Sequence, residues 1–403
     1  MKGIYSIWVT FWLLLTSFGS SAQTIGSAFV YDFNTADQSN TGIRLEGSAF
    51  VGSNTLNTKM FTEVLLEPKF SDLSKRTFLG RSQPKVNFFS SYGWNISYVK
   101  NTKIGFFLRN NRFQTYTSDK SFAELLLFGN GLFRGKEAFT HNLNFFQGSM
   151  YTGGVRYVLL DRKNIKISSS LGLSMLENYA EAKANRMSIY TALDGSFLDV
   201  NISGFALSES DRGIQGVGLA GDIILDYKFN NQNSMSVQAL NINGLFLVNS
   251  QNLYIDTVFR YTGLPFDAFN SSQSLSNQID SVYQETINRN KSAKKTTIAP
   301  SEFLLKWRTR LNPKNEIILS LQAVSLGRYG FSANTGLIHS FSNRLKMVSS
   351  VGYGNFTGFL WREAVEYKLK SYRLYASVNS IQATIIPAQT QNYGFGLGVF
   401  KQL

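Results

Sequence analysis

The chain has 403 residues, 43% of them hydrophobic, and carries 40 Lys and Arg against 26 Asp and Glu, a formal net charge of +14. It has no cysteine and two histidines, which excludes disulfides, thiol catalysis and a cysteine-containing zinc cluster. Because the sequence shows no basic helix and no motif of alternating aromatic and basic residues, its positive charge does not indicate nucleic-acid binding.

The N-terminus has the three parts of a cleavable export signal. Lys2 supplies the positive charge, an apolar run spans residues 7–18, and small residues precede a cleavage site after Ala22. The apolar run is short for a membrane-spanning helix, which needs about 20 residues. We therefore predict a signal peptide at residues 1–22, removed on export, and an N-terminal periplasmic segment at residues 23–42.

Residues 86–98 alternate between apolar and polar side chains. Tyr92, Trp94 and Tyr98 share one parity, and Asn95 lies on the other. Because side chains alternate across a strand, this segment is one strand with an apolar face and a polar face. Behind an export signal, this pattern is typical of an outer-membrane barrel, with the apolar face toward lipid and the polar face toward the lumen.

Short polar turns divide the chain into hairpins of such strands. The turns lie at residues 100–103, 161–164, 230–233, 312–315, 342–344 and 370–371. Together with one strand before the first hairpin and one after the last, they predict fourteen strands, at residues 43–51, 86–99, 103–113, 151–160, 165–176, 217–229, 234–248, 302–311, 315–326, 329–341, 345–356, 359–369, 372–381 and 393–400.

The predicted fold class is all-β: a transmembrane antiparallel up-and-down β-barrel over residues 43–403. A further hairpin, with arms at 189–193 and 197–202, would raise the strand count to sixteen. Its arms are short, so we expect it outside the membrane.

In one strand the apolar residues change parity. Val237 and Ala239 are apolar on odd positions, whereas Ile242 and Phe246 continue on even positions. A β-bulge near residues 239–240 would restore the two faces. Without a bulge, the strand would have to face protein on both sides, as it would against a plug.

Short turns normally face the periplasm and long loops the exterior. The long loops would be residues 52–85, 114–150, 177–216 and 249–301. In the last loop, residues 274–289 have apolar residues at helical spacing, which predicts a short amphipathic helix that either caps or plugs the pore or lies on the loop surface. A second helix is predicted where Ser121 and Glu124 form a capping box, ending at Gly129.

The lumen parity carries charged residues on several strands, predominantly basic. The lumen-facing candidates are Lys306, Arg308, Arg310, Glu316, Arg362, Glu366 and Lys368. The candidates for the lipid interface are Tyr92, Trp94, Tyr98, Trp307 and Trp361. With a turn after residue 311, Arg310 lies opposite Glu316 and can pair with it. The charged wall indicates either anion selectivity or, as in many small barrels, a salt-bridged interior.

No catalytic or metal site is predicted. His141 and His339 share parity with aromatic residues, which places both at apolar or interfacial faces, and neither has the partners of a catalytic histidine. We expect no enzyme activity, no metal and no cofactor.

Four segments, at residues 125–136, 153–167, 188–204 and 304–313, carry a resemblance to a known family. In their order they resemble an uncharacterised outer-membrane barrel family, a domain of unknown function in Gram-negative bacteria that use type IX secretion. The resemblance covers nearly the whole mature chain. It implies a barrel distantly similar to long-chain fatty-acid transporters and to accessory barrels of type IX secretion, with no catalytic residues. The C-terminus departs from the usual barrel pattern, because an aromatic residue is not last.

Two functional classes follow from these observations. The first is a porin-like passive channel or transporter for a small anionic or amphipathic solute, located in the cell outer membrane. The second is a non-transporting barrel that anchors or assists a secretion or surface-assembly complex. The expected partners are outer-membrane lipid and lipopolysaccharide, the barrel assembly machinery and, in the second class, a secretion-complex protein. Nucleic acid is not among them.

Overall fold

The computed structural model describes most of the chain after its N-terminal region. The described residues are 41–66, 70–100, 103–209, 213–247, 251–261, 288–291, 296–325, 329–354, 358–387 and 389–403. The predicted signal peptide and nearly all of the predicted periplasmic segment lie outside them, so both stay predictions.

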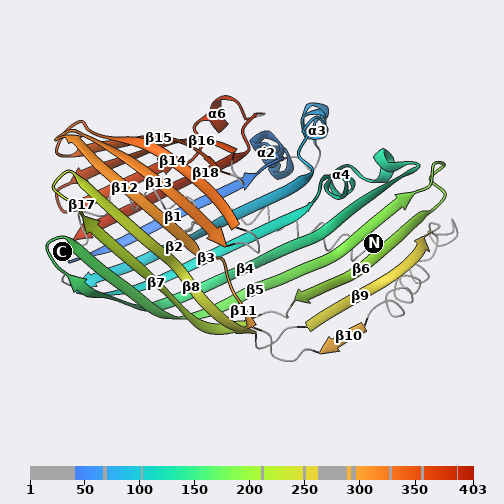
Figure 1. The fold of residues 1–403 in the computed structure, drawn as a ribbon, viewed down its shortest axis with the longest axis horizontal. Coiled ribbons are helices and arrows are strands. Elements are labelled where there is room, and N and C mark those ends of the chain that lie inside the picture. The colour runs from blue at the N-terminus through green and yellow to red at the C-terminus, as the bar shows by residue number, and fades with distance from the viewer. Residues whose placement is uncertain are drawn as a thin grey trace.

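Within the described residues, fourteen strands close into one antiparallel ring (Figure 1). In ring order they are β1 (Gly42–Ser53), β2 (Lys85–Lys100), β3 (Ile104–Asp119), β4 (Lys136–Asp161), β5 (Ile165–Thr191), β7 (Gly216–Lys228), β8 (Asn233–Leu247), β12 (Glu302–Asn312), β13 (Asn315–Ser325), β14 (Tyr329–Ser340), β15 (Leu345–Gly354), β16 (Gly358–Leu369), β17 (Tyr372–Val378) and β18 (Asn392–Gln402). β1 pairs with both β2 and β18, which closes the barrel. The predicted fold class and the fourteen predicted strands are confirmed.

Two strands continue well beyond the ring. β4 and β5 pair with each other along most of their length, and β5 then splits its other edge between β7 near the short turns and β6 (Leu198–Glu209) farther out. β6 pairs with β9 (Gln251–Tyr261), and β9 with β10 (Asn288–Lys291), so a sheet extends from one side of the long-loop end (Figure 1). The short β11 (Thr296–Thr297) pairs with the end of β8.

The extension corrects three predicted loops, since β9 and β10 lie within residues 249–301. The outer parts of β4 and β5 lie within residues 114–150 and 177–216, which the sequence pattern assigned to loops. The register of their pairing shifts between Gln147 and Ser149, where β5 has one residue more than β4. Asn142 of β4 and Asn178 of β5 have left-handed backbone, with φ of 63° and 52°. The extra residue reverses the parity of β5, and the left-handed residues interrupt the alternation on both strands, so regular alternation never lasts long enough to be recognised. The hairpin that could have raised the count to sixteen does form, outside the ring.

Helices cover the long-loop ends of β2 and β3. α2 (Thr58–Leu66) and α3 (Asp72–Leu79) occupy the predicted loop 52–85, and α4 (Lys120–Phe128) follows β3. Their buried contacts are Met60, Phe78, Val86 and Ala123. A 3₁₀ helix, η2 (Asn130–Phe133), and a short α6 (Gln382–Ile385) complete the helices of the described residues, none of which is long and apolar enough to cross a membrane.

The second predicted helix exists, but its capping differs from the prediction. α4 begins after Asp119, and Gly129, with a φ of 81°, ends it. The Ser121 hydroxyl lies inside the helix and donates to the carbonyl of Phe139, 2.8 Å away, so no capping box forms. The other predicted helix, 274–289, lies outside the described residues except for its last two positions, which belong to β10.

The outward side chains of the ring form an apolar belt. Its exposed members include Ile43, Leu45, Leu108, Leu173, Leu219, Leu319, Leu337, Val351, Phe359 and Leu397. Leu173 alone exposes 69% of its surface. Water-soluble proteins rarely expose a continuous apolar surface of this extent, whereas a barrel in a bilayer requires one. The belt is therefore the lipid-facing surface.

The predicted β-bulge is confirmed. Gly221 pairs with Ile242 and Ile223 pairs with Ala239, so β8 has one residue more than β7 between these pairs. The bulge includes Asn241, whose φ of 57° is in the left-handed region that asparagine tolerates. It keeps the apolar side chains of β8 on the lipid side despite the parity change.

Candidate functional site

The lumen wall of β12 to β18 carries a continuous apolar cluster, which we call the collar. Each of these seven strands contributes one buried inward residue to it: Leu304, Ile318, Ile338, Val348, Ala364, Tyr375 and Phe400. The collar was not predicted from the sequence, because its members are isolated apolar residues on a parity that is otherwise polar. A single apolar residue on each of several successive strands is the signal that could have identified it.

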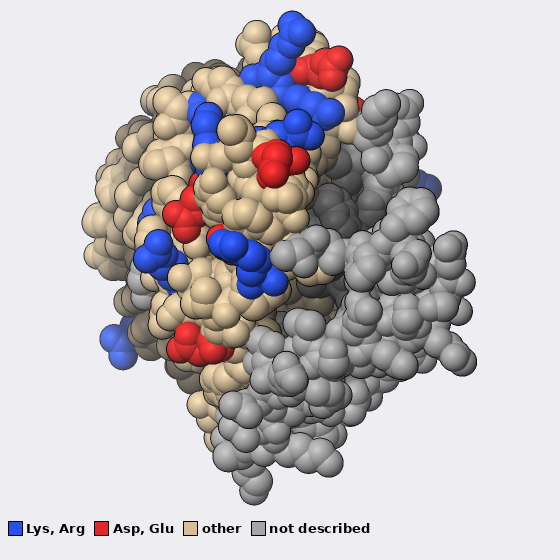
Figure 2. All heavy atoms as spheres, turned by 90° about the vertical axis from the view of Figure 1, so that its right-hand side faces the viewer, with Lys and Arg blue, Asp and Glu red and all other residues tan. Residues whose placement is uncertain are grey.

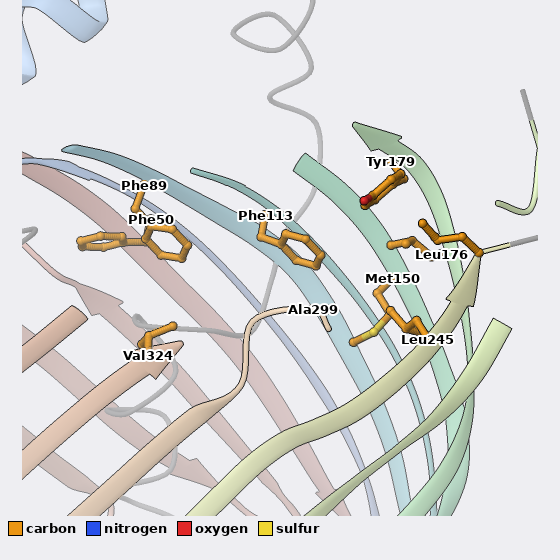
Figure 3. Packing of buried hydrophobic residues seen from close by; sticks show 10 residues of the cluster. Phe50, Phe89, Phe113, Met150, Leu176, Tyr179, Leu245, Ala299 and Val324 are labelled. Carbon is orange, nitrogen blue, oxygen red and sulfur yellow. The ribbon is translucent and has the colours of Figure 1, made fainter. Parts of the chain in front are cut away.

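A second apolar cluster lies in the barrel toward the long-loop end (Figure 3). It consists of Phe50, Phe89, Phe113, Met150, Leu176, Tyr179, Leu245, Leu247, Ala299 and Val324. Most of its members come from strands of the other half of the ring, β1 to β8. Ala299 comes instead from the segment 298–301, which precedes β12 and runs inside the barrel beside β8 (Figure 3).

Hydrogen bonds to the bulge of β8 hold the segment 298–301. The Asn243 side chain accepts from the Ala299 amide at 2.8 Å and donates to the Ala299 carbonyl at 3.0 Å. Asn241 Nδ2 donates to the carbonyl of Pro300 at 2.6 Å, and the Ser301 hydroxyl donates to the carbonyl of Asn241 at 2.9 Å. The bulge thus fixes a non-strand segment inside the lumen.

An ion pair inside the lumen joins β3 and β7, which have β4 and β5 between them in the ring. One Arg109 nitrogen lies 2.9 and 3.0 Å from the two carboxylate oxygens of Asp222. The same carboxylate accepts hydrogen bonds from the Ser170 hydroxyl at 2.6 Å and from the Asn241 amide at 2.8 Å. Because both oxygens are satisfied, this buried charge has the partners that such a position requires.

The structure divides the predicted lumen-facing residues into two groups. Lys306, Arg362 and Glu366 are buried, and the charge of Glu302 interacts with Lys306 and Arg362. Glu366 lies 3.9 Å from Lys346.

The remaining lumen-facing candidates lie nearer the short turns. Arg310 is 3.3 Å from Glu316, in the register that places them opposite one another. Lys368 is exposed near the turn between β16 and β17. Arg308 is half-buried on β12, between Lys306 and Arg310.

The predicted interfacial aromatics all lie on the outward parity. Trp361 is exposed, and its indole N–H donates to Glu363 at 2.7 Å. Trp307 is half-buried against Phe229, with ring centroids 4.9 Å apart. Tyr92, Trp94 and Tyr98 are half-buried along β2. Their position at the membrane interface stays a prediction.

A cavity of about 80 Å³ lies against the lumen wall of β1 to β8, between Arg109 and the short turns. Its cationic lining is Arg44, Lys103, Arg109, Arg156 and Lys166, and its anionic lining among the described residues is Asp222. Phe107, Ile224, Leu240 and Phe400 supply apolar surface. Since Phe400 also belongs to the collar, the cavity lies where the basic wall meets the collar.

The long-loop end has a different charge pattern. Figure 2 shows Lys and Arg interspersed with Asp and Glu over its described surface, with no large area of one sign. The described surface of the long-loop end therefore does not share the concentration of positive charge found in the cavity.

Both histidines pack beside aromatic side chains. His339 Nδ1 lies 2.7 Å from Asn315 Oδ1, and its ring packs on Phe341. His141 is exposed beside Phe139, with Nδ1 3.7 Å from Asp119. Among the described residues, no group of three or more His, Asp or Glu could hold a metal ion.

Comparison with known proteins gives distant structural likenesses. No family model matches the chain, and no curated protein matches it. The toluene transporter TodX of Pseudomonas putida superposes with a TM-score of 0.45 at 12% identity, over 96% of both chains. The toluene transporter TbuX of Ralstonia pickettii gives a TM-score of 0.44 at 8% identity, over 91% of this chain and 90% of that one.

A FadL homologue of Pseudomonas aeruginosa gives a TM-score of 0.44 at 9% identity, over 90% of both chains. Because all three TM-scores are below 0.5, we base nothing on these likenesses. The barrel fold rests on the strand pairing of this chain, and the family suggested by the sequence stays a prediction.

Proposed function

We propose that this protein is an outer-membrane barrel that carries a small anionic or amphipathic solute through its lumen. The observation that carries the proposal is the cavity, where five cationic side chains and one carboxylate line the same space as apolar ones, Phe107, Ile224, Leu240 and Phe400 among them. A basic wall attracts anions and raises their local concentration. The apolar belt and the predicted export signal support the location.

The buried charges of β12 to β16 contribute differently. Lys306 and Arg362 have a carboxylate, Glu302, within electrostatic range. Their charges are offset in part by this carboxylate, and partly offset charges attract solutes less strongly. The cations nearer the short turns and those around the cavity are therefore the ones expected to select the solute.

Uptake into proteoliposomes tests the proposal. We expect the full chain to admit a short carboxylate faster than its neutral amide. This preference should be lost when Arg156 and Lys166, two cations of the cavity, are both replaced by glutamine. Lys183→Gln, an exposed change in the extension, is the matched control. Equal uptake of acid and amide by the unaltered protein would contradict the proposal.

The extension favours a second candidate function, a barrel that anchors or assists a secretion or surface-assembly complex. Tyr254, Val258 and Tyr261 of β9 are exposed on a sheet outside the ring. Any link to type IX secretion rests on the sequence resemblance alone. Pull-down of the unaltered chain and of a variant with Tyr254, Val258 and Tyr261 replaced by serine separates the two functions, because loss of a stable, identified protein partner supports only the second.

A further inference from the structure

The lining of the cavity carries five cations and one carboxylate, so its positive charge is neutralised only in part. Arg44 is also 3.4 Å from Glu46, outside the lining. Both oxygens of Asp222 are already occupied, by Arg109, Ser170 and Asn241. Arg109 is 6% exposed, and its Nε is buried without a hydrogen-bond partner among the described residues. Buried polar groups are nearly always paired, so an orphaned donor of a buried guanidinium indicates a missing acceptor.

Other donors line the same space. Arg156 of β4 donates a hydrogen bond to the Ser168 hydroxyl of β5 at 3.1 Å. Lys166, two residues before Ser168 on β5, also lines the cavity. Guanidinium groups bind carboxylates and phosphates with charge-assisted hydrogen bonds. An anion in the cavity would therefore have several donors from β3, β4 and β5 around it.

The rest of the lining restricts what kind of anion fits. Two of the arginines lie over aromatic rings of the cavity: Arg109 is 5.2 Å from the centroid of Phe107, and Arg44 is 5.6 Å from that of Phe400. Ile224 and Leu240 add aliphatic surface. A wholly polar anion such as phosphate would leave this surface without a partner, whereas an anion with a short hydrocarbon part would cover it.

The size of the cavity limits that hydrocarbon part. Its volume of about 80 Å³ is roughly half that of a 150 Å³ cavity able to hold benzene. A carboxylate with a chain of about two to four carbons therefore matches the space better than a long-chain acid.

We propose that the cavity is a binding site for a short-chain monocarboxylate. The carboxylate binds the wall formed by Arg109, Arg156 and Lys166, and the chain lies against Phe400 and Leu240. Lys103, which is exposed in the turn between β2 and β3, marks where the cavity reaches the short-turn rim. The site rests on the proposed transport function, since it lies in the lumen that the solute would cross.

Calorimetric titration of the full chain in detergent tests the site, with propionate, propionamide and inorganic phosphate as probes. We expect saturable binding of propionate that is about tenfold tighter than that of phosphate, and no binding of the amide. Arg156→Gln should weaken propionate binding about tenfold, whereas Arg156→Lys, which keeps the charge, should weaken it less. Lys183→Gln should leave it unchanged.

Equal binding of phosphate, absence of saturable binding, or unchanged affinity in Arg156→Gln would overturn the assignment. Heat-modified migration on gels shows whether each variant has folded. If Arg156→Gln does not fold, Lys166→Met provides the same test from the neighbouring strand. Uptake without saturable binding would contradict the binding site but not the transport function. Saturable binding without uptake would contradict the transport function but not the binding site.

Discussion

The two halves of the lumen wall follow the same alternation of side chains but use it differently. From β12 to β18, the inward residues pack into a collar and the charges beside it are buried near opposite charges. From β1 to β8, small inward residues such as Ser168 and Ser170 leave a cavity among cations. The comparison teaches that parity determines which residues face the lumen, whereas side-chain volume determines where space remains.

The ion pair of the first half offers the largest effect. Asp222→Ala leaves the buried Arg109 without its carboxylate, which should lower the free energy of unfolding by about 3 to 5 kcal/mol. Urea titration of the barrel in lipid vesicles measures it. A double variant, Arg109→Met with Asp222→Leu, removes both charges and should be less destabilised. If both variants lose the same free energy of unfolding, the unpaired charge of Arg109 is not the cause of the loss.

The collar can be tested with two adjacent residues of β14. Ile338 is 5% exposed and faces the collar, whereas Leu337 is 43% exposed on the lipid side. Ile338→Ala should cost about 2 to 5 kcal/mol because it opens a cavity among packed side chains. Leu337→Ala should cost less, because lipid fills the space. Equal losses in the same urea titration would show that the collar is not packed.

A charge placed on each face of β2 distinguishes lipid from lumen. Trp94→Lys should cost about 2 to 4 kcal/mol if the side chain lies near the middle of the bilayer. Asn95→Lys should be tolerated, because Asn95 Nδ2 lies 3.3 Å from the carboxylate of Glu46. The yield of folded barrel in vesicles measures both. Equal tolerance at the two positions would contradict the assignment of faces.

The smallest expected effect is a pH dependence of α2 and α3, the helices that cover the long-loop ends of β2 and β3. Burial alone would raise the pKa of Glu63, but hydrogen bonds from Ser71 and the charge of Lys59 lower it below its ordinary value of 4.5. Since the folded-state pKa is the lower one, the ionised Glu63 stabilises the α2–α3 pair above pH 4.5, and this contribution is lost as the pH falls through the folded-state pKa.

Amide hydrogen exchange at Ser71 and Ser74 is the measurement, compared at neutral and acidic pH. Protection should fall in acid for the unaltered protein and should change little with pH in Glu63→Gln. If the protection of these two amides is the same at neutral and acidic pH in the unaltered protein, this carboxylate does not hold the two helices together.

The ring was predictable because its strands repeat a two-residue period against lipid, and even the bulge near Ala239 follows from one change of parity. The extension was not predictable, since the left-handed Asn142 and Asn178 and the extra residue of β5 opposite Gly148 interrupt that period. The cavity was missed for a different reason. Arg109 and Asp222 are far apart in sequence and on strands that do not pair, so only the closed ring brings them together. Of the charged residues predicted to face the lumen from β12 and β16, three are buried: Lys306, Arg362 and Glu366.

The reversal potential of the protein in a planar bilayer under a potassium chloride gradient tests the central claim most directly, because it reports the charge that the lumen selects. The proposed function predicts a potential of the sign given by chloride preference, reduced when Arg156 and Lys166 are both neutralised and unchanged by Lys183→Gln. A potential near zero, or one of the opposite sign, would contradict it.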